Sequence, residues 1–118
     1  MKGMMPSHYR KLMDMPDCGT DTCVVCGRLA TNRHHVVPRS LGGHDGPTVA
    51  LCGSGTTGCH GLAELKRLHF RFVKDKLIEI EPNTESWTTY GWWEFLITPE
   101  PVSYWEALKM DGWLRCRE

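Results

Sequence analysis

Residues 33–60 read RHHVVPRSLGGHDGPTVALCGSGTTGCH, and CVVC at residues 23–26 precedes them. The letters RHHVV favour a strand that ends at Pro38, because proline cannot donate a hydrogen bond to a sheet. The loop SLGGHDG then turns the chain back, and residues 48–51 favour a returning strand. The stretch therefore predicts a β-hairpin.

The sequence HGLAELKRL follows the last cysteine of this stretch and favours a helix. At about 100° per residue, His60, Glu64 and Arg67 share one face of that helix. The opposite face carries Leu62 and Leu65, which we expect to face the core. A histidine and a carboxylate four residues apart can hold one divalent cation, so the sequence predicts a cation between hairpin and helix.

Four of the six cysteines form two pairs. Cys23 and Cys26 have the two-residue spacing that is usual for zinc, whereas six residues, three of them glycine, separate Cys52 from Cys59. Four thiolates satisfy a tetrahedral Zn²⁺ ion, and glycine permits the tight path that the wider loop needs. Since the core of a 118-residue chain is modest, such a staple is useful. The spacing predicts a structural zinc site.

Cys18 and Cys116 stand outside this scheme. Cys18 is an alternative to Cys23 as a ligand, although its spacing to Cys26 is poorer, and Cys116 is expected to be an ordinary thiol. The CxxC pair could instead be a redox dithiol, but the thioredoxin-like βαβ context is absent, or a pair of buried thiols. Three disulfides in a secreted domain are a further alternative.

The first residues, MKGMMPSHYRKLMDMPD, lack the apolar segment of a signal peptide, and no stretch approaches the ~20 apolar residues of a membrane span. We therefore expect a cytoplasmic protein without a membrane partner, in which reducing conditions keep the thiols free to bind metal. The net charge is 0 and the pI is about 7.0, so binding of nucleic acid requires a local basic patch.

The length favours one domain, residues 1–118. The predicted hairpin, helix, later strands and closing helix indicate the α+β class. We divide it into an N-terminal arm (1–22), a metal-binding core (23–70) and a β-rich extension (71–118). After the core, HFRFV, LIEI and WWEFLIT favour the strands of a hairpin or short sheet, with turns expected at KDK and EPNTES. PVSYWEALKM predicts a short closing helix that begins near Pro101.

His34 and His35 are adjacent in the first predicted strand. Neighbouring strand residues point to opposite faces, so both imidazoles cannot easily reach one ion. The pair suggests a division of labour, in which one imidazole binds a metal and the other accepts a proton. A surface histidine pair, or a histidine that only caps a zinc loop, is the alternative interpretation.

These residues resemble the HNH endonuclease family, whose ββα-metal motif places a cation between a hairpin and a helix. The resemblance covers residues 23–70, through CVVC, HHVVP with its GG loop, LC and CH. Within the family the chain resembles the zinc-stapled type common in bacteriophage genomes. The resemblance implies that His34 and His60 bind a catalytic cation and that His35 is the general base. It also implies the ligands of the structural zinc, which are Cys23, Cys26, Cys52 and Cys59.

The chain departs from the family's pattern at two positions. The central residue of the family, usually Asn, steadies the hairpin loop, but no Asn lies between Arg33 and His60. His44 and Asp45 are the candidates for its role. Many relatives carry a histidine four residues after the helical one, where this chain has Glu64. A carboxylate suits hard cations, so we expect Glu64 to be the third ligand of the catalytic cation beside His34 and His60. The expected cation is Mg²⁺ or Mn²⁺, with Ni²⁺ and Zn²⁺ as further candidates.

The reaction that the resemblance implies is hydrolysis of a DNA phosphodiester. His35 would take a proton from a water molecule in line with the phosphorus, while the cation stabilises charge on the phosphoryl oxygen and the departing 3′ oxygen. DNA is the expected partner, and its expected phosphate contacts are Arg33, Arg39 and Arg67. The family context suggests phage DNA processing in the cytoplasm of a bacterial host, with packaging proteins as further partners.

A second hypothesis is a zinc-stapled module that has lost catalysis and binds DNA or a protein. The missing Asn and the presence of Glu64 favour it, and Glu64 is then an ordinary solvated helix residue. A zinc deaminase is excluded, because the pattern HxE followed by PCxxC is absent from the sequence.

Overall fold

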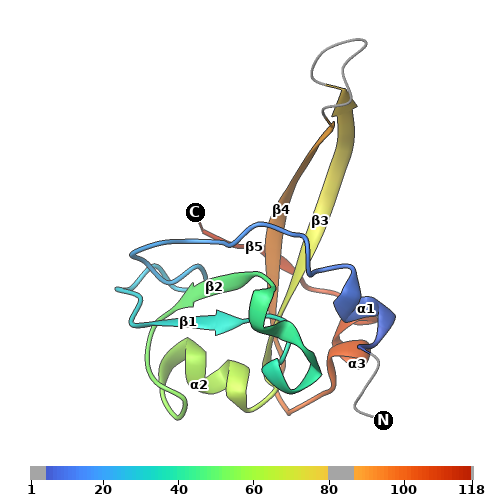
Figure 1. Ribbon diagram of the computed structural model, residues 1–118. Coiled ribbons are helices and arrows are strands. Elements are labelled where there is room, and N and C mark those ends of the chain that lie inside the picture. The colour runs from blue at the N-terminus through green and yellow to red at the C-terminus, as the bar shows by residue number, and fades with distance from the viewer. Residues whose placement is uncertain (1–4, 80–86, 118) are drawn as a thin grey trace.

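The computed structural model describes residues 5–79 and 87–117. These ranges hold two antiparallel sheets, the hairpin β1–β2 and the three-stranded sheet β3–β4–β5 (Figure 1). The predicted α+β class is confirmed. In chain order the elements are α1 (Ser7–Arg10), β1 (Asn32–His35), η1 (Arg39–Leu41), η2 (Gly43–Asp45), β2 (Thr48–Leu51), α2 (Gly58–Glu64), β3 (Leu68–Glu79), β4 (Trp87–Ile97), α3 (Tyr104–Leu108) and β5 (Leu114–Arg115).

The strands β1 and β2 pair antiparallel over their whole lengths, so the predicted hairpin is present and its second strand has the predicted bounds. Val49 and Leu51 of β2 are fully buried and belong to one core cluster with Phe70. The N-terminal segment lies along the edge of β2, where the amide of Cys18 donates to the carbonyl oxygen of Thr48 over 2.9 Å. The hairpin is thereby fixed between this segment and the rest of the core.

Helix α2 begins at Gly58 and ends at Glu64, several residues before the predicted end. The amide of Lys66 donates to Ala63 and that of Arg67 to Leu62, which is the hydrogen-bond pattern of a Schellman cap, and Lys66 has the positive φ of 60° that this cap requires. Arg67 therefore lies beyond the helix, and its predicted place on the face of His60 is wrong.

The predicted core face of α2 is also wrong in part. Leu65 is 57% exposed, because the helix has already ended at this residue. The buried positions of α2 are instead occupied by Cys59, Gly61 and Ala63. Small residues at these positions allow the helix to lie close to the loop that precedes it. A Cβ on Gly61 would lie 2.7 Å from the carbonyl carbon of Thr56.

The strands β3 and β4 form a long antiparallel ribbon that rises away from the hairpin and α2 (Figure 1). The predicted turn at KDK is wrong, because these residues belong to β3 and only a register shift occurs between Lys74 and Lys76. The second predicted turn, at EPNTES, lies outside the described residues.

The closing helix is present as α3, which begins after Ser103 and not near Pro101. The hydroxyl oxygen of Ser103 accepts a hydrogen bond of 3.2 Å from the amide of Glu106, and this N-cap sets the first residue of the helix. α1 and α3 lie side by side (Figure 1). In the part of the chain that the structure describes, no helix has the length and apolar character that crossing a membrane requires.

Candidate functional site

Four cysteine side chains converge where the CVVC segment meets the loop between β2 and α2. The ligand atoms of Cys23, Cys26, Cys52 and Cys59 all lie within 4.8 Å of one another. The sulfurs of Cys26 and Cys52 are 3.5 Å apart. A disulfide has an S–S distance of about 2.05 Å, whereas four sulfurs at about 2.3 Å from zinc form a tetrahedron with edges of roughly 3.8 Å. The cluster could therefore hold a structural metal such as zinc.

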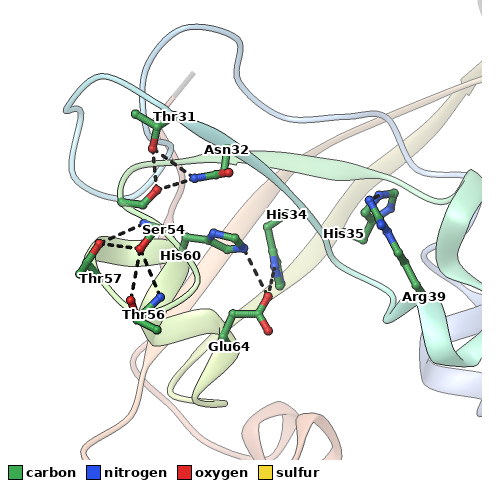
Figure 2. Close-up of polar contacts among 11 residues, drawn as sticks. Thr31, Asn32, His34, His35, Arg39, Ser54, Thr56, Thr57, His60 and Glu64 are labelled. Carbon is green, nitrogen blue, oxygen red and sulfur yellow. Dashed lines mark hydrogen bonds and ion pairs between the residues drawn. The ribbon is translucent and has the colours of Figure 1, made fainter.

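The loop that carries the second cysteine pair depends on its glycines. Gly53 and Gly58 have φ values of 84° and 63°, and a Cβ on Gly53 would lie 2.1 Å from the carbonyl oxygen of Thr57. Thr31 donates a hydrogen bond of 2.6 Å to the carbonyl oxygen of Gly53, and the side chain of Asn32 donates to the same oxygen (Figure 2). These contacts fix the cysteine loop to the start of β1.

The thiols of Cys23, Cys26 and Cys59 differ in how easily they lose a proton. Burial would raise the pKa of Cys23, but hydrogen bonds from the backbone amides of Cys26, Val25 and Cys52 outweigh it and lower the pKa to about 7. Burial raises the pKa values of Cys26 and Cys59, and the neighbouring thiols raise them further. A divalent metal ion would overcome the effect by which neighbouring thiols raise one another's pKa, because metal binding stabilises the thiolate form of every ligand.

Cys18 and Cys116 are buried and lie outside the four-thiol cluster. Cys18, the alternative ligand, forms its backbone contacts with β2. A hydrogen bond with the thiol of Cys18 raises the pKa of Cys116, and burial raises it further. The two cysteines therefore pack against each other in the core.

A second cluster of possible metal ligands joins β1 to α2. Nδ1 of His34 lies 3.7 Å from Oε1 of Glu64, and Nε2 of His60 lies 3.3 Å from the same oxygen (Figure 2). All three ligand atoms lie within 4.8 Å of one another. Two imidazole nitrogens and a carboxylate oxygen form a donor set that suits a divalent cation. In the absence of a cation, direct polar contacts of the two imidazoles with Glu64 account for the same geometry.

The imidazole of His34 is held in the form that binds metals. Burial lowers its pKa to about 4, against the opposing effect of Glu64 and with smaller contributions from His60 and His35. The ring is therefore neutral at pH 7. Nδ1 of His60 is buried and has no hydrogen-bond partner among the described residues, so the ring of His60 lacks the outer contact that usually orients a metal-binding histidine.

His35 points away from this cluster, as the alternation of strand residues predicts (Figure 2). Its Nδ1 lies 3.1 Å from the carbonyl oxygen of Gly43, and its Nε2 lies 3.3 Å from Nη2 of Arg39. A carbonyl only accepts and a guanidinium only donates, so Nδ1 carries the proton and Nε2 presents its lone pair. This tautomer is the one that a base acting through Nε2 requires.

The loop that orients His35 is held by its own backbone. The amide of Gly43 donates to the carbonyl oxygen of Pro38 over 3.1 Å. A Cβ on Gly43 would lie 1.9 Å from the carbonyl oxygen of Val37, so only glycine fits at this position. The GG letters of the sequence indicated a turn, but they did not indicate which carbonyl would face the histidine.

The side chains of His44 and Asp45 are exposed and form no hydrogen bond or ion pair with any other described residue. The prediction that one of these two side chains steadies the hairpin loop is therefore wrong. The backbone hydrogen bonds of η1 and η2 hold the loop instead.

The three predicted phosphate contacts lie in different places. Arg39 is exposed and adjoins the imidazole just described. Arg33 lies on the same face of β1 as His35 and on the opposite face from His34. Its guanidinium donates to the hydroxyl of Thr48 over 2.8 Å and to the carbonyl oxygen of Gly19 over 3.1 Å. Arg67 donates to the carbonyl oxygen of Thr98 over 3.0 Å. Of the three, only Arg39 has a side-chain contact with a residue of the candidate site, among the residues that the structure describes.

One cavity connects the metal ligands with His35. It has a volume of about 340 Å³, and its lining includes His34, His35 and Glu64. The volume is within the range of about 300–1,000 Å³ that is usual for small-ligand sites. Tyr104 and Lys66 also line the cavity. Nothing in the sequence placed Tyr104 there, because a contact so distant in the chain has no local pattern.

Comparisons with models of protein families, with curated proteins and with solved structures give no match. The roles of these residues are therefore argued from their geometry and chemistry. The geometry offers two ligand sets and one oriented imidazole within a single small fold.

Proposed function

We propose that this chain is a metal-dependent DNA endonuclease with a ββα-metal site of the HNH type. The observation that carries the proposal is the state of His35. Its Nε2 has a lone pair, its Nδ1–H is held by Gly43, and the ring lines the same cavity as His34 and Glu64. A structural zinc module has no need of such an arrangement, whereas hydrolysis needs a base beside a cation.

In the proposed reaction His35 accepts a proton from a water molecule in line with the phosphorus. Arg39 leaves Nε2 and contacts a phosphate oxygen when DNA enters. His34, His60 and Glu64 would hold one divalent cation, Mg²⁺ or Mn²⁺. When bound, the cation supplies positive charge near the phosphoryl oxygen and the departing 3′ oxygen. The products carry 5′ phosphates.

Structural zinc in the four-cysteine cluster would set the position of the helix relative to the hairpin. Cys52 follows β2 directly, and Cys59 lies in α2 immediately before His60. Ligation of both cysteines therefore fixes the distance between His60 and β1. The zinc contributes to catalysis through this placement and does not touch the substrate.

DNA is the proposed partner. Arg39 contacts its phosphates near the site, and Arg33 and Arg67 contact phosphates further away. We place the reaction in phage DNA processing, in the cytoplasm of a bacterial host, with packaging proteins as further partners. The competing function is a module that binds DNA or a protein without cutting. The polar contacts of Glu64 with His34 and His60 favour that function, because they account for the second cluster without a cation.

Glu64 provides a direct test of the second ligand set. Replacing it with Gln is expected to raise the Mn²⁺ concentration for half-maximal plasmid nicking by roughly tenfold or more, since one charged ligand is lost. Glu64→His is expected to shift the preference toward Ni²⁺ and Zn²⁺. The measurement is nicking of supercoiled plasmid against Mn²⁺ concentration, with zinc content recorded for each variant.

The matched control is Glu106→Gln, which removes an exposed helical carboxylate in α3 whose one ion pair among the described residues is with Lys109. Its Mn²⁺ curve should coincide with that of the wild type. Superimposable curves for wild type and Glu64→Gln would remove Glu64 from the site.

A further inference from the structure

Part of the cavity beside the metal ligands is not used by the reaction proposed above. This part is lined by Tyr9 of α1 and Tyr104 of α3, together with Phe70 and Val36. The two tyrosine rings are stacked, with centroids 4.8 Å apart and an interplanar angle of 14°. Flat aromatic ligands suit such a lining, because they can lie against rings and apolar side chains.

Tyr104 also presents a polar group without a protein partner. The residue is only 7% exposed, yet its hydroxyl forms no hydrogen bond with any other described residue. The hydroxyl itself is not buried, so it is accessible from the cavity that Tyr104 lines, and a ligand there can form a hydrogen bond with it. The ligand therefore needs a flat face and a hydrogen-bonding edge.

A positively charged side chain also lines the same cavity. Lys66 is exposed, lines the cavity and forms no side-chain hydrogen bond or ion pair within the described ranges. Its φ of 60° is one that lysine disfavours, and the position is usually glycine in a Schellman cap. The amide of Val102 and Nε2 of His69 hold its carbonyl oxygen at 3.0 Å and 2.8 Å. The fold thus places a lysine in a backbone conformation that glycine would adopt with less strain.

We propose that this cavity binds one unpaired nucleobase next to the scissile phosphate, and that Lys66 contacts the adjoining phosphate. The inference rests on the proposed function. A paired base has both faces stacked and its edge occupied, so only an unpaired base can bring its face to the rings and its edge to the hydroxyl of Tyr104. The substrate class is DNA with unpaired nucleotides, such as a bubble or a single strand.

Binding is measured without added divalent cation, so that the proposed reaction does not proceed. The probe is an oligonucleotide duplex with a short central bubble that contains 2-aminopurine, whose fluorescence falls on stacking. A fully paired duplex of the same length is the reference. We expect quenching on binding and affinity for the bubble about tenfold above that for the duplex.

Two variants test the named contacts. Lys66→Gly removes the ammonium and relieves the unfavourable φ, so the fold should be as stable as the wild type or more so. Its affinity should depend less steeply on salt, with the slope of log affinity against log salt reduced by about 0.7–0.9. Tyr104→Phe keeps the ring and should lower the preference for the bubble severalfold. Lys109→Ala, an exposed lysine of α3 outside the cavity lining, should leave the salt slope unchanged.

Equal affinity for bubble and duplex, or fluorescence that does not change on binding, would overturn the proposal. An unchanged salt slope in Lys66→Gly would remove the phosphate contact. Plasmid nicking in Mn²⁺ is assayed separately. It distinguishes failure of the proposed base pocket from failure of the proposed nuclease activity. Nicking without the fluorescence response would reject the base pocket and keep the proposed function, whereas the response without nicking would support the pocket and reject the nuclease.

Discussion

Replacing Cys26 with serine is expected to remove zinc from the protein and to lower its melting temperature by roughly 10 °C or more. Structural zinc sites contribute on the order of 10 kcal/mol to folding, and in a domain of this size a loss of about 3 kcal/mol already shifts the midpoint by that amount. The effect is large because the four thiolates join the CVVC segment to the loop between β2 and α2. Metal analysis and thermal unfolding measure both consequences.

The control for this substitution is Cys116→Ala, which removes a buried thiol outside the cluster. It should keep one zinc per chain and lose only the stability that its packing contributes. Purified wild-type protein without zinc, or a melting temperature of Cys26→Ser equal to that of the wild type, would show that the cysteines are not a structural metal site.

Replacing His35 with alanine is expected to lower metal-dependent DNA cleavage by about 10²–10⁴-fold, the contribution that a general base usually makes. The variant should keep its zinc and its melting temperature, because His35 is only half-buried and backbone hydrogen bonds hold the loop that it contacts. The loss should appear in kcat and not in DNA binding, since the base acts in the transition state. Single-turnover nicking with a DNA-binding assay separates the two.

His44→Ala is the matched control, since this exposed histidine lies in η2, the same loop that orients His35. It should cleave at the wild-type rate. Full activity of His35→Ala would assign the base to another residue, and unfolding of that variant would make His35 a structural residue.

Local sequence predicted much of the hairpin because alternation and turn residues act over short distances. The strand at residues 48–51 was predicted with its observed bounds, and the separation of His34 from His35 followed from the alternation of a strand. The sequence predicts that four of the cysteines form one cluster, because their spacing is typical of a metal site, and the structure brings these four together.

The end of α2 could not be predicted in the same way. Schellman caps usually have glycine where this chain has Lys66, so the sequence contains no residue that indicates the end of the helix at this position. The carbonyl oxygen of Lys66 is held by Val102 and His69, and Val102 is a contact from a distant part of the chain. Tertiary contacts therefore outweighed the helix pattern and removed Arg67 from the face that carries His60.

The tautomer of His35 was likewise beyond sequence reasoning. It depends on the direction of the Gly43 carbonyl, which is set by two successive 3₁₀ turns. The sequence suggested that a side chain replaced the family's Asn, whereas the structure uses the backbone of a position where only glycine fits. A resemblance in letters could indicate the site but not how this chain orients it.

The central claim, that the oriented imidazole and the second ligand set form a nuclease, is tested most directly by nicking of supercoiled plasmid. Wild-type protein with its cysteine zinc intact is incubated with plasmid over a range of Mn²⁺ or Mg²⁺ concentrations. We predict nicked DNA with 5′ phosphates that appears only when the cation is added and is lost in His35→Ala. Plasmid that is bound but remains uncut at every cation concentration would contradict the account and leave a binding module.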